Sequence, residues 1–178
     1  MYPLHTLATS DLLWRQPKFG MDHYELRAGP GLLATISWPR WLSDLAVARC
    51  AAASWELDRP DFFRQTVVAC PAGSAQEVAR AEFDWLKDAR LQLADGRAYE
   101  FYRTYAFRQA WALVSEPGQL VYEIEFGMRW FKRLARVRLA APPSTPQLDL
   151  LLCLGLYLGC CIIEDAAVVV AATTAAVC

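Results

Sequence analysis

Residues 148–163, LDLLLCLGLYLGCCII, form a segment that is apolar on every side of a helix. The segment follows Thr145 and Pro146, a favourable helix start because the threonine hydroxyl caps the first turn and proline suits the first helical position. Asp149 falls in that first turn, where the helix dipole favours an acid. We therefore predict a helix over residues 147–163. A helix that is apolar all round belongs either inside a protein or inside a membrane.

The membrane alternative is limited by length and charge. The uncharged run at 150–163 is shorter than the roughly 20 residues that a membrane helix needs. A longer span would place Glu164 and Asp165 near mid-bilayer, at about 2.5–3.5 kcal/mol each. A window at 144–163 avoids both acids, and the basic residues before it and acids after it satisfy the positive-inside rule. A membrane span therefore remains the alternative.

Most of the chain before this segment shows strand patterning. Between residues 20 and 140, runs such as VYEIEF and ARVRL alternate apolar and polar residues, which is typical of half-buried strands. Turn signals separate the runs, among them Asp95-Gly96 and Pro117-Gly118. The spacing predicts roughly ten to twelve strands in a barrel or sandwich. The alanine-rich stretch 40–57 stays open between helix and strand.

The apolar segment and the strands fit together if the helix fills a barrel. Eight strands close into a barrel that its own side chains fill, whereas ten to twelve strands enclose more room. A helix over 148–163, at about 1.5 Å per residue, spans roughly 24 Å, close to the height of such a barrel. Gly155 and Gly159 place small residues on one side of the helix, where a strand or an aromatic ring can approach closely.

Several longer motifs carry a resemblance to a known family. They are YELRAGPGLLATI, ASWELDRPDFFRQTVV, RLQLADGRAYEFYRTYAFRQAWAL and, after the proline-rich connector APPSTP, LDLLLCLGLYLG. Over residues 20–163 the chain resembles the tubby C-terminal-like superfamily, which includes the tubby domain, the phospholipid scramblases and the LURP-one-related proteins. The resemblance implies a mainly β fold: a closed antiparallel barrel of about twelve strands around a central hydrophobic C-terminal helix.

The end of the chain departs from that family pattern. Residues 164–178, rich in Ala and Val, follow the point where the helix closes the family domain. They are expected to form a last strand, an amphipathic extension or a frayed tail. Scramblases also carry an acidic calcium-binding segment near their helix, and Glu164-Asp165 is too sparse to match it.

Composition and length indicate one folded domain. The chain has 178 residues, 55% hydrophobic residues and a formal net charge of −1, which argues against disorder and gives no global field for nucleic acid. Its six cysteines lack CxxC spacing and it has two histidines, so we expect no zinc site and no cofactor. The first residues lack signal-peptide features, which favours the cytoplasm. The expected domain comprises a lead-in at 1–19, barrel strands at 20–140, the central helix at 147–163 and an apolar tail at 164–178.

One charge feature stands out, the stretch MRWFKRLARVRL at 128–139. It holds five cations and no acid, with Trp130 and Phe131 interleaved, and such a pattern is typical of an anionic membrane contact. The tubby resemblance makes a phosphoinositide headgroup the natural ligand. The structural alternative is a solvated strand face whose charges protect an edge from aggregation. The candidate site residues are Arg129, Lys132, Arg133, Arg136 and Arg138.

No catalytic motif is recognisable, since GxSxG, P-loop, dinucleotide-binding and HExxH patterns are all missing from the sequence. We therefore expect a non-enzymatic tubby-like module that binds anionic phospholipid or a protein partner through its barrel exterior. The alternative is a membrane-anchored, scramblase-like protein that uses 148–163 as a transmembrane helix.

Overall fold

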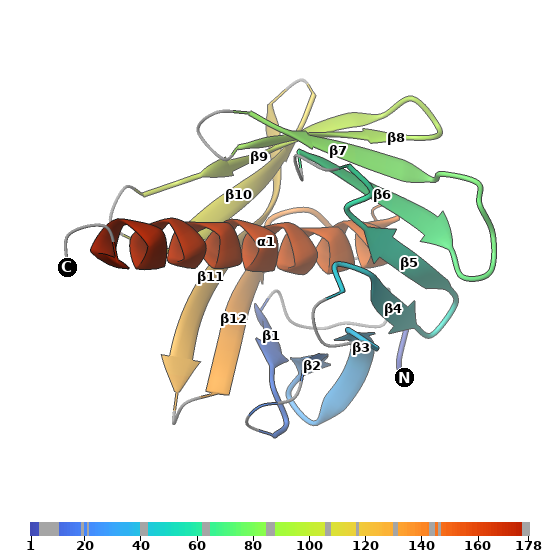
Figure 1. The fold of residues 1–178 in the computed structure, drawn as a ribbon. Helices are drawn as coiled ribbons and strands as arrows, with labels where there is room; N and C mark the ends of the chain where they lie inside the picture. The colour runs from blue at the N-terminus through green and yellow to red at the C-terminus, as the bar shows by residue number, and fades with distance from the viewer. Residues whose placement is uncertain are drawn as a thin grey trace.

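The structure is a computed structural model that describes residues 1–3, 11–18, 20, 22–39, 43–61, 65–84, 88–105, 108–116, 118–129, 132–142, 145 and 147–175, with the side chains of the last segment to residue 167. Twelve strands are followed by one helix (Figure 1). Their bounds are β1 Asp11–Arg15, β2 His23–Ala28, β3 Gly31–Ser37, β4 Ala46–Cys50, β5 Ser54–Asp58, β6 Thr66–Pro71, β7 Ala79–Phe83, β8 Ala89–Leu93, β9 Ala98–Arg103, β10 Ala110–Ser115, β11 Gln119–Arg129, β12 Lys132–Leu139 and α1 Leu148–Ala175.

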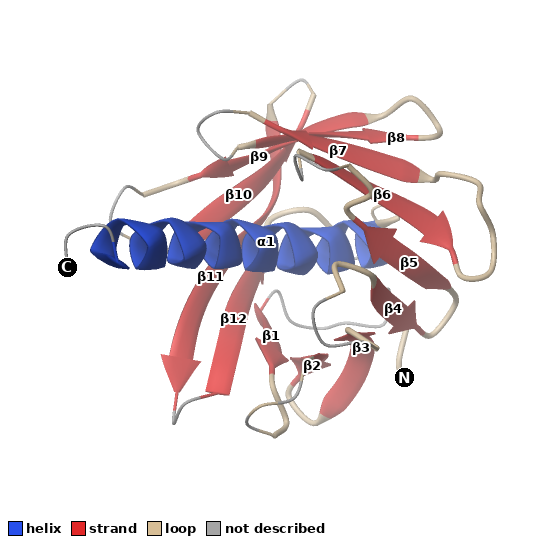
Figure 2. Ribbon diagram, viewed as in Figure 1, coloured by secondary structure: helices blue, strands red, loops and turns tan. Residues whose placement is uncertain are grey.

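The strands form a closed antiparallel barrel. Each strand pairs with its neighbours in the chain, and β1 pairs with both β2 and β12, which closes the sheet. Figure 2 shows the single helix running between the strands on either side of it. The predicted twelve-stranded barrel around a C-terminal helix is confirmed.

The inner wall of the barrel is built to leave room for a helix. Alternate residues of each strand point inward, as period-two strands require, and in β8 the inward residues are Ala89, Leu91 and Leu93. Many of the buried strand positions are alanines, whose small side chains leave the centre of the barrel open. The strand alanines that belong to the core are Ala34, Ala46, Ala48, Ala69, Ala79, Ala81, Ala89 and Ala135.

The helix α1 occupies that space. Its side chains are buried almost without interruption from Leu148 to Ile162, so the apolar segment lies inside the barrel, as predicted. The helix is longer than the predicted 147–163, because it continues through Glu164 and Asp165 to Ala175. Of the three possibilities for 164–178, the described backbone is a helical extension; no glycine or proline occurs there to end it.

The two helix glycines are where the barrel wall comes closest to α1. A Cβ atom added at Gly155 would overlap the ring of Tyr122, and one added at Gly159 would overlap the ring of Phe126, both on β11. The Tyr122 hydroxyl donates a hydrogen bond to the Leu151 carbonyl at 2.7 Å. The prediction that these glycines admit a close ring is therefore confirmed.

The alanine-rich stretch 40–57, left open between helix and strand, contributes two strands. Ala46 and Ala48 are buried on β4, and a short turn leads into β5. In that turn the Cys50 amide donates to the Ala53 carbonyl at 2.9 Å. Residues 40–42 lie outside the described residues. Alternating burial, rather than helix propensity, decides the local structure here.

By length and composition alone, one helix would be able to cross a membrane. The window Leu148–Ala167 has a mean hydropathy of 1.9, and 72% of it is buried inside the protein. The core helix of a soluble protein passes the same length and composition test, so hydropathy by itself does not separate the two environments.

Candidate anion-binding surface

Closure of the barrel brings arginines from both ends of the strand region together. Because β1 pairs with β12, Leu13 lies opposite Arg136 and Asp11 lies opposite Arg138. Because β1 also pairs with β2, Leu13 lies opposite Arg27 on its other side. All five residues therefore share the outer wall of the barrel across three adjacent strands.

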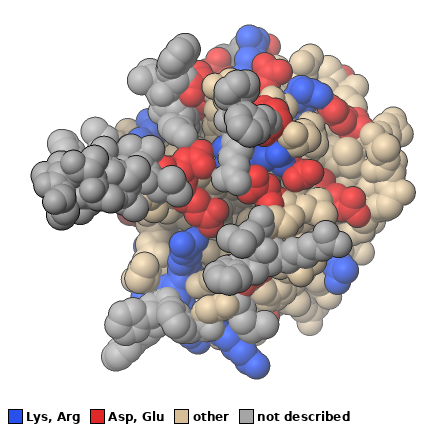
Figure 3. Space-filling view, viewed as in Figure 1, with Lys and Arg blue, Asp and Glu red and all other residues tan. Residues whose placement is uncertain are grey.

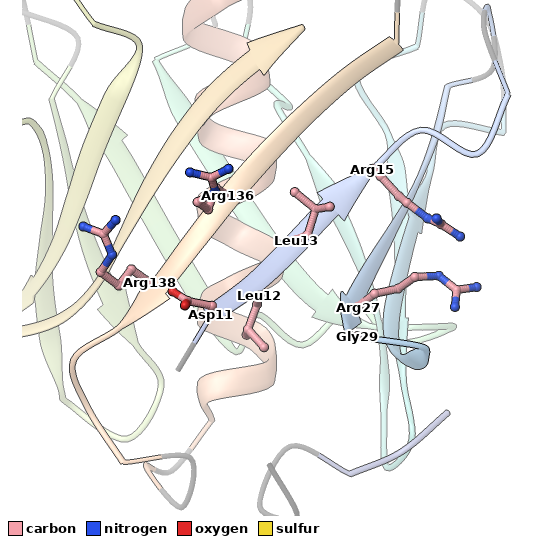
Figure 4. A pocket seen from close by; sticks show the side chains of 8 residues that line it. All are labelled: Asp11, Leu12, Leu13, Arg15, Arg27, Gly29, Arg136 and Arg138. Atoms are coloured by element: carbon pink, nitrogen blue, oxygen red, sulfur yellow. The ribbon is translucent and has the colours of Figure 1, made fainter. Parts of the chain in front are cut away.

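These strands enclose a shallow hollow of about 360 Å³, here called the arginine groove. Figure 4 shows Arg136 and Arg138 on one side of β1, and Arg15 and Arg27 side by side on the other. Leu13 lies between the two pairs and is 37% exposed. The groove thus combines four guanidinium groups with one exposed apolar side chain. Among the described residues that line it, Asp11 is the one acid.

Three arginines of the groove, Arg15, Arg27 and Arg138, lie beside acids on the same wall. Arg27 donates from Nε to a Glu25 carboxylate oxygen at 2.9 Å, and an Arg15 nitrogen lies 3.5 Å from the same oxygen. Burial raises the pKa of the Glu25 carboxyl, but the hydrogen bond and charge of Arg27, with the charge of Arg15, outweigh it and hold that pKa below its usual value. Arg138 lies 3.7 Å from Glu123. The Arg138–Glu123 pair is exposed, with side chains 64% and 41% accessible, and such a pair contributes only about 0–1 kcal/mol, so a phosphate can replace that carboxylate at low cost.

The five predicted cations divide between two faces of the β11–β12 hairpin. Arg136 and Arg138 line the groove. Arg129 and Lys132 lie opposite each other where β11 ends and β12 begins, and Lys132 donates to the Pro17 carbonyl at 2.9 Å. Trp130 and Phe131, expected to act with them, lie outside the described residues.

Arg133 belongs to a different place. It shares strand parity with the buried Ala135 and Val137, so it points toward the helix and not toward the groove. Its guanidinium donates a hydrogen bond to the Glu164 carboxylate of α1 at 3.3 Å. The positive charge of Arg133 therefore does not contribute to the outer wall. The structure therefore separates Arg133 from the other four predicted cations.

Sequence reasoning missed Arg15 and Arg27. Residues 1–19 were expected to be a lead-in, but Asp11–Arg15 forms β1 and completes the barrel. The signal that was available is the period-two pattern of DLLWR, in which Leu12 and Trp14 are buried. Nothing local in the sequence indicates that this strand lies beside β12.

A second charged cluster lies at the mouth of the barrel, where α1 leaves it. The side chain of Arg59 is only 3% exposed and makes two hydrogen bonds to the Asp165 carboxylate, at 3.3 and 3.0 Å. Its guanidinium also lies 5.6 Å from the centre of the Phe83 ring. Burial lowers the pKa of Arg59, but the hydrogen bond to Asp165 and the nearby Cys161 and Asp165 raise it above its ordinary value. This pair ties the barrel wall to the helix near the point where the buried part of α1 ends.

Metal and thiol chemistry find little support in the part of the chain that the structure describes. Among those residues, no three His, Cys, Asp or Glu side chains lie close enough together to hold a metal ion. The described cysteines are free thiols, namely Cys50, Cys70, Cys153, Cys160 and Cys161. Burial raises the pKa of Cys160 to about 12, so this thiol is protonated at neutral pH.

Comparison with known proteins identifies the fold and no family. No family model and no curated protein matches the sequence. Among solved structures, the chain is similar to the X-ray structure of a protein from Arabidopsis thaliana, AT5G01750, with a TM-score of 0.56 and 13% sequence identity. The match covers 92% of this chain and 96% of the plant protein. At this identity the likeness supports the barrel architecture over nearly the whole of both chains.

Proposed function

We propose that the protein is a non-enzymatic, tubby-like barrel of the cytoplasm that binds anionic phospholipid headgroups on its outer wall. The observation that supports this most is the arginine groove, in which Arg15, Arg27, Arg136 and Arg138 surround the exposed Leu13. Guanidinium groups bind phosphate through paired hydrogen bonds, and an adjacent apolar side chain suits the boundary between headgroup and acyl chain. The family resemblance stated from the sequence points to the same ligand chemistry.

The wall around the groove favours a reversible surface contact. The four arginines are accompanied by Asp11, Glu25 and Glu123, so the local excess of positive charge is small. Binding is then expected to weaken as salt is added, because exposed charges are screened over about 8–10 Å at physiological ionic strength. The protein would sit at the membrane as a peripheral partner.

Partition onto vesicles that contain phosphatidylserine or a phosphoinositide tests the proposal. In the double variant Arg27→Gln/Arg136→Gln, we expect a roughly thirty-fold loss of partition, because each arginine near an anionic surface contributes about 1 kcal/mol. The measurement is co-sedimentation with the vesicles at two salt concentrations. Circular dichroism establishes that the variant keeps its strands.

The control is a second pair of exposed arginines on a distant part of the wall. Arg80 and Arg90 lie on β7 and β8, their side chains are 46% and 71% exposed, and each pairs with a glutamate. Arg80→Gln/Arg90→Gln changes net charge by the same amount and is expected to reduce partition much less. Equal losses from both pairs, or no binding by the unaltered protein, would remove the groove from the proposal.

The membrane-anchored, scramblase-like alternative is supported by one observation, the hydropathy of Leu148–Ala167. It predicts that the protein is extracted only by detergent. The barrel proposal predicts a protein that stays in solution without detergent, since the same helix is enclosed by strands.

A further inference from the structure

Arg136 and Arg138 border a second hollow, on the side of β12 that faces β11. It encloses about 120 Å³ and is here called the charge-paired hollow. Besides the two arginines, its described lining residues include Glu123, Glu125, Tyr105 and Arg108. Figure 4 shows the guanidinium groups of Arg136 and Arg138 extending from β12 toward β11. The two arginines therefore lie between the arginine groove and a neighbouring hollow that contains acids.

Antiparallel pairing sets each of these arginines directly across from an acid of β11. Glu123 is opposite Arg138, and Glu125 is opposite Arg136. The members of each strand are two residues apart, so all four side chains share the outer face of the barrel. Arg138 lies 3.7 Å from Glu123, and both side chains are well exposed. The wall thus presents two cation–acid couples in a row, and not a purely positive surface.

This arrangement discriminates between phosphate ligands by the other charges that they carry. A headgroup with phosphates alone would bring its negative charge beside Glu123 and Glu125, and like charges in close contact are unfavourable. A headgroup that carries an amine beside its phosphate places the phosphate on a guanidinium group and the amine on a carboxylate. Every charge then stays paired, and the exposed couple that the ligand replaces is weak.

The dimensions of the wall suit such a ligand. Adjacent strands lie about 4.7–4.9 Å apart, so a cation of β12 and the acid opposite it are separated by about one strand spacing. A phosphate and an amine that are joined by two carbons can span this separation. Tyr105, which is 58% exposed, adds an aromatic ring to the lining, and the Arg108 guanidinium already lies 5.7 Å from its centre. Such a ring face also attracts an ammonium group.

Mixed charge by itself does not mark a binding site on this protein. Figure 3 shows Asp and Glu side chains gathered over the middle of the drawn face, with Lys and Arg among them. The wall of β11 and β12 carries an argument because its couples are fixed by strand register and border two hollows, one of which is the arginine groove.

We propose that the arginine groove and the charge-paired hollow together select a headgroup with an amine beside its phosphate, and that this headgroup is the phosphoserine of phosphatidylserine. The phosphate and the serine carboxylate lie against Arg136 and Arg138, and the amine lies against Glu123 and Glu125. This inference rests on the proposed function, because it names the headgroup that the same wall takes. The acids, which oppose a purely anionic headgroup, contribute to the binding of this one.

Partition of the protein onto two kinds of vesicle with equal net charge tests the inference. Phosphatidylserine and phosphatidylglycerol, each mixed with phosphatidylcholine, carry the same negative charge, but only the serine lipid has an amine. The unaltered protein is expected to prefer phosphatidylserine roughly fivefold, which is the scale of one exposed ion pair. In Glu123→Gln/Glu125→Gln the ratio of the two partition coefficients is expected to fall to about one.

The matched control removes two acids from a distant part of the wall. Glu77 precedes β7 and Glu82 lies on it, and both are exposed. Glu77→Gln/Glu82→Gln changes net charge by the same amount and is expected to raise partition onto both lipids alike, so that the ratio stays near fivefold. Circular dichroism establishes that both double variants keep their strands.

The outcomes separate this inference from the proposed function. Equal partition of the unaltered protein onto the two lipids, or a ratio kept in Glu123→Gln/Glu125→Gln, overturns it, while a loss in Arg27→Gln/Arg136→Gln still supports the groove. Tighter binding to phosphatidylglycerol or to a phosphoinositide overturns it too. No partition onto any anionic vesicle overturns both proposals. Calorimetric binding of soluble O-phosphoserine without partition onto vesicles would overturn the lipid assignment in favour of a free phosphorylated amine.

Discussion

Gly155→Ala is expected to destabilise the protein by about 2–3 kcal/mol, although alanine is the better helix former. Helix propensity alone favours alanine by about 1 kcal/mol. Overpacking a well-packed core costs about 1–3 kcal/mol and occasionally more. At Gly155 the new methyl group would overlap Tyr122, which is fully buried and held by its hydrogen bond to Leu151. Because that ring is fully buried and hydrogen-bonded, we expect the cost of the steric overlap to exceed the gain in helix propensity.

The neighbouring glycine provides the matched control. A methyl group at Gly159 would overlap the ring of Phe126, which is only half-buried and is therefore less constrained than Tyr122. Gly159→Ala is therefore expected to cost less than Gly155→Ala. Urea unfolding measures the loss of stability in both variants, from the shift of the transition midpoint when the dependence of the unfolding free energy on urea is unchanged. A Gly155→Ala protein as stable as the unaltered one would contradict the close contact between α1 and β11.

Asp165→Asn is expected to lower the free energy of unfolding by about 3 kcal/mol. Breaking a buried ion pair by removing one partner costs about 3–5 kcal/mol, because the remaining charge stays buried without compensation. Here the remaining charge is Arg59, whose side chain is 3% exposed. The lower end of that range applies, since the asparagine oxygen still accepts a hydrogen bond and Asp44 also favours the charged arginine.

The adjacent acid, Glu164, provides the matched comparison for Asp165→Asn. Glu164→Gln removes the same charge one residue earlier in α1, but its pair with Arg133 is exposed, with side chains 61% and 47% accessible. Exposed pairs contribute about 0–1 kcal/mol, so the expected loss is small and vanishes at high salt. Urea unfolding of both variants checks that Asp165→Asn loses more stability than Glu164→Gln. Equal losses would mean that Arg59 is not buried against the helix as described.

Much of the architecture was predictable because its determinants are local. Alternation of apolar and polar residues marks each strand, and continuous apolarity marks the helix inside them. Even the close approach at Gly155 and Gly159 followed from their spacing. The end of the helix was not predictable, because Glu164 and Asp165 resembled a boundary. Their partners are far away in the sequence, since Arg133 lies on β12 and Arg59 directly follows β5.

The candidate site was only partly predictable, because it depends on closure of the barrel. Arg136 and Arg138 were selected because they belong to a run of five cations without an acid, but Arg15 and Arg27 reach them only through pairing of β1 with β12 and β2. Arg133 was grouped with its neighbours by closeness in the sequence. Its strand parity, shared with Ala135, already indicated the opposite face.

The central claim is that the apolar helix fills the barrel, and thiol labelling in detergent-free buffer tests it directly. Cys153, Cys160 and Cys161 lie on α1 and are buried, whereas Cys50 and Cys70 are partly exposed on the strands. Mass spectrometry of alkylated protein is expected to find the three helix thiols unlabelled until urea unfolds the strands, and labelled together at that transition. Labelling of the three at the rate of Cys50 and Cys70, while circular dichroism still reports intact strands, would contradict a helix enclosed by the barrel.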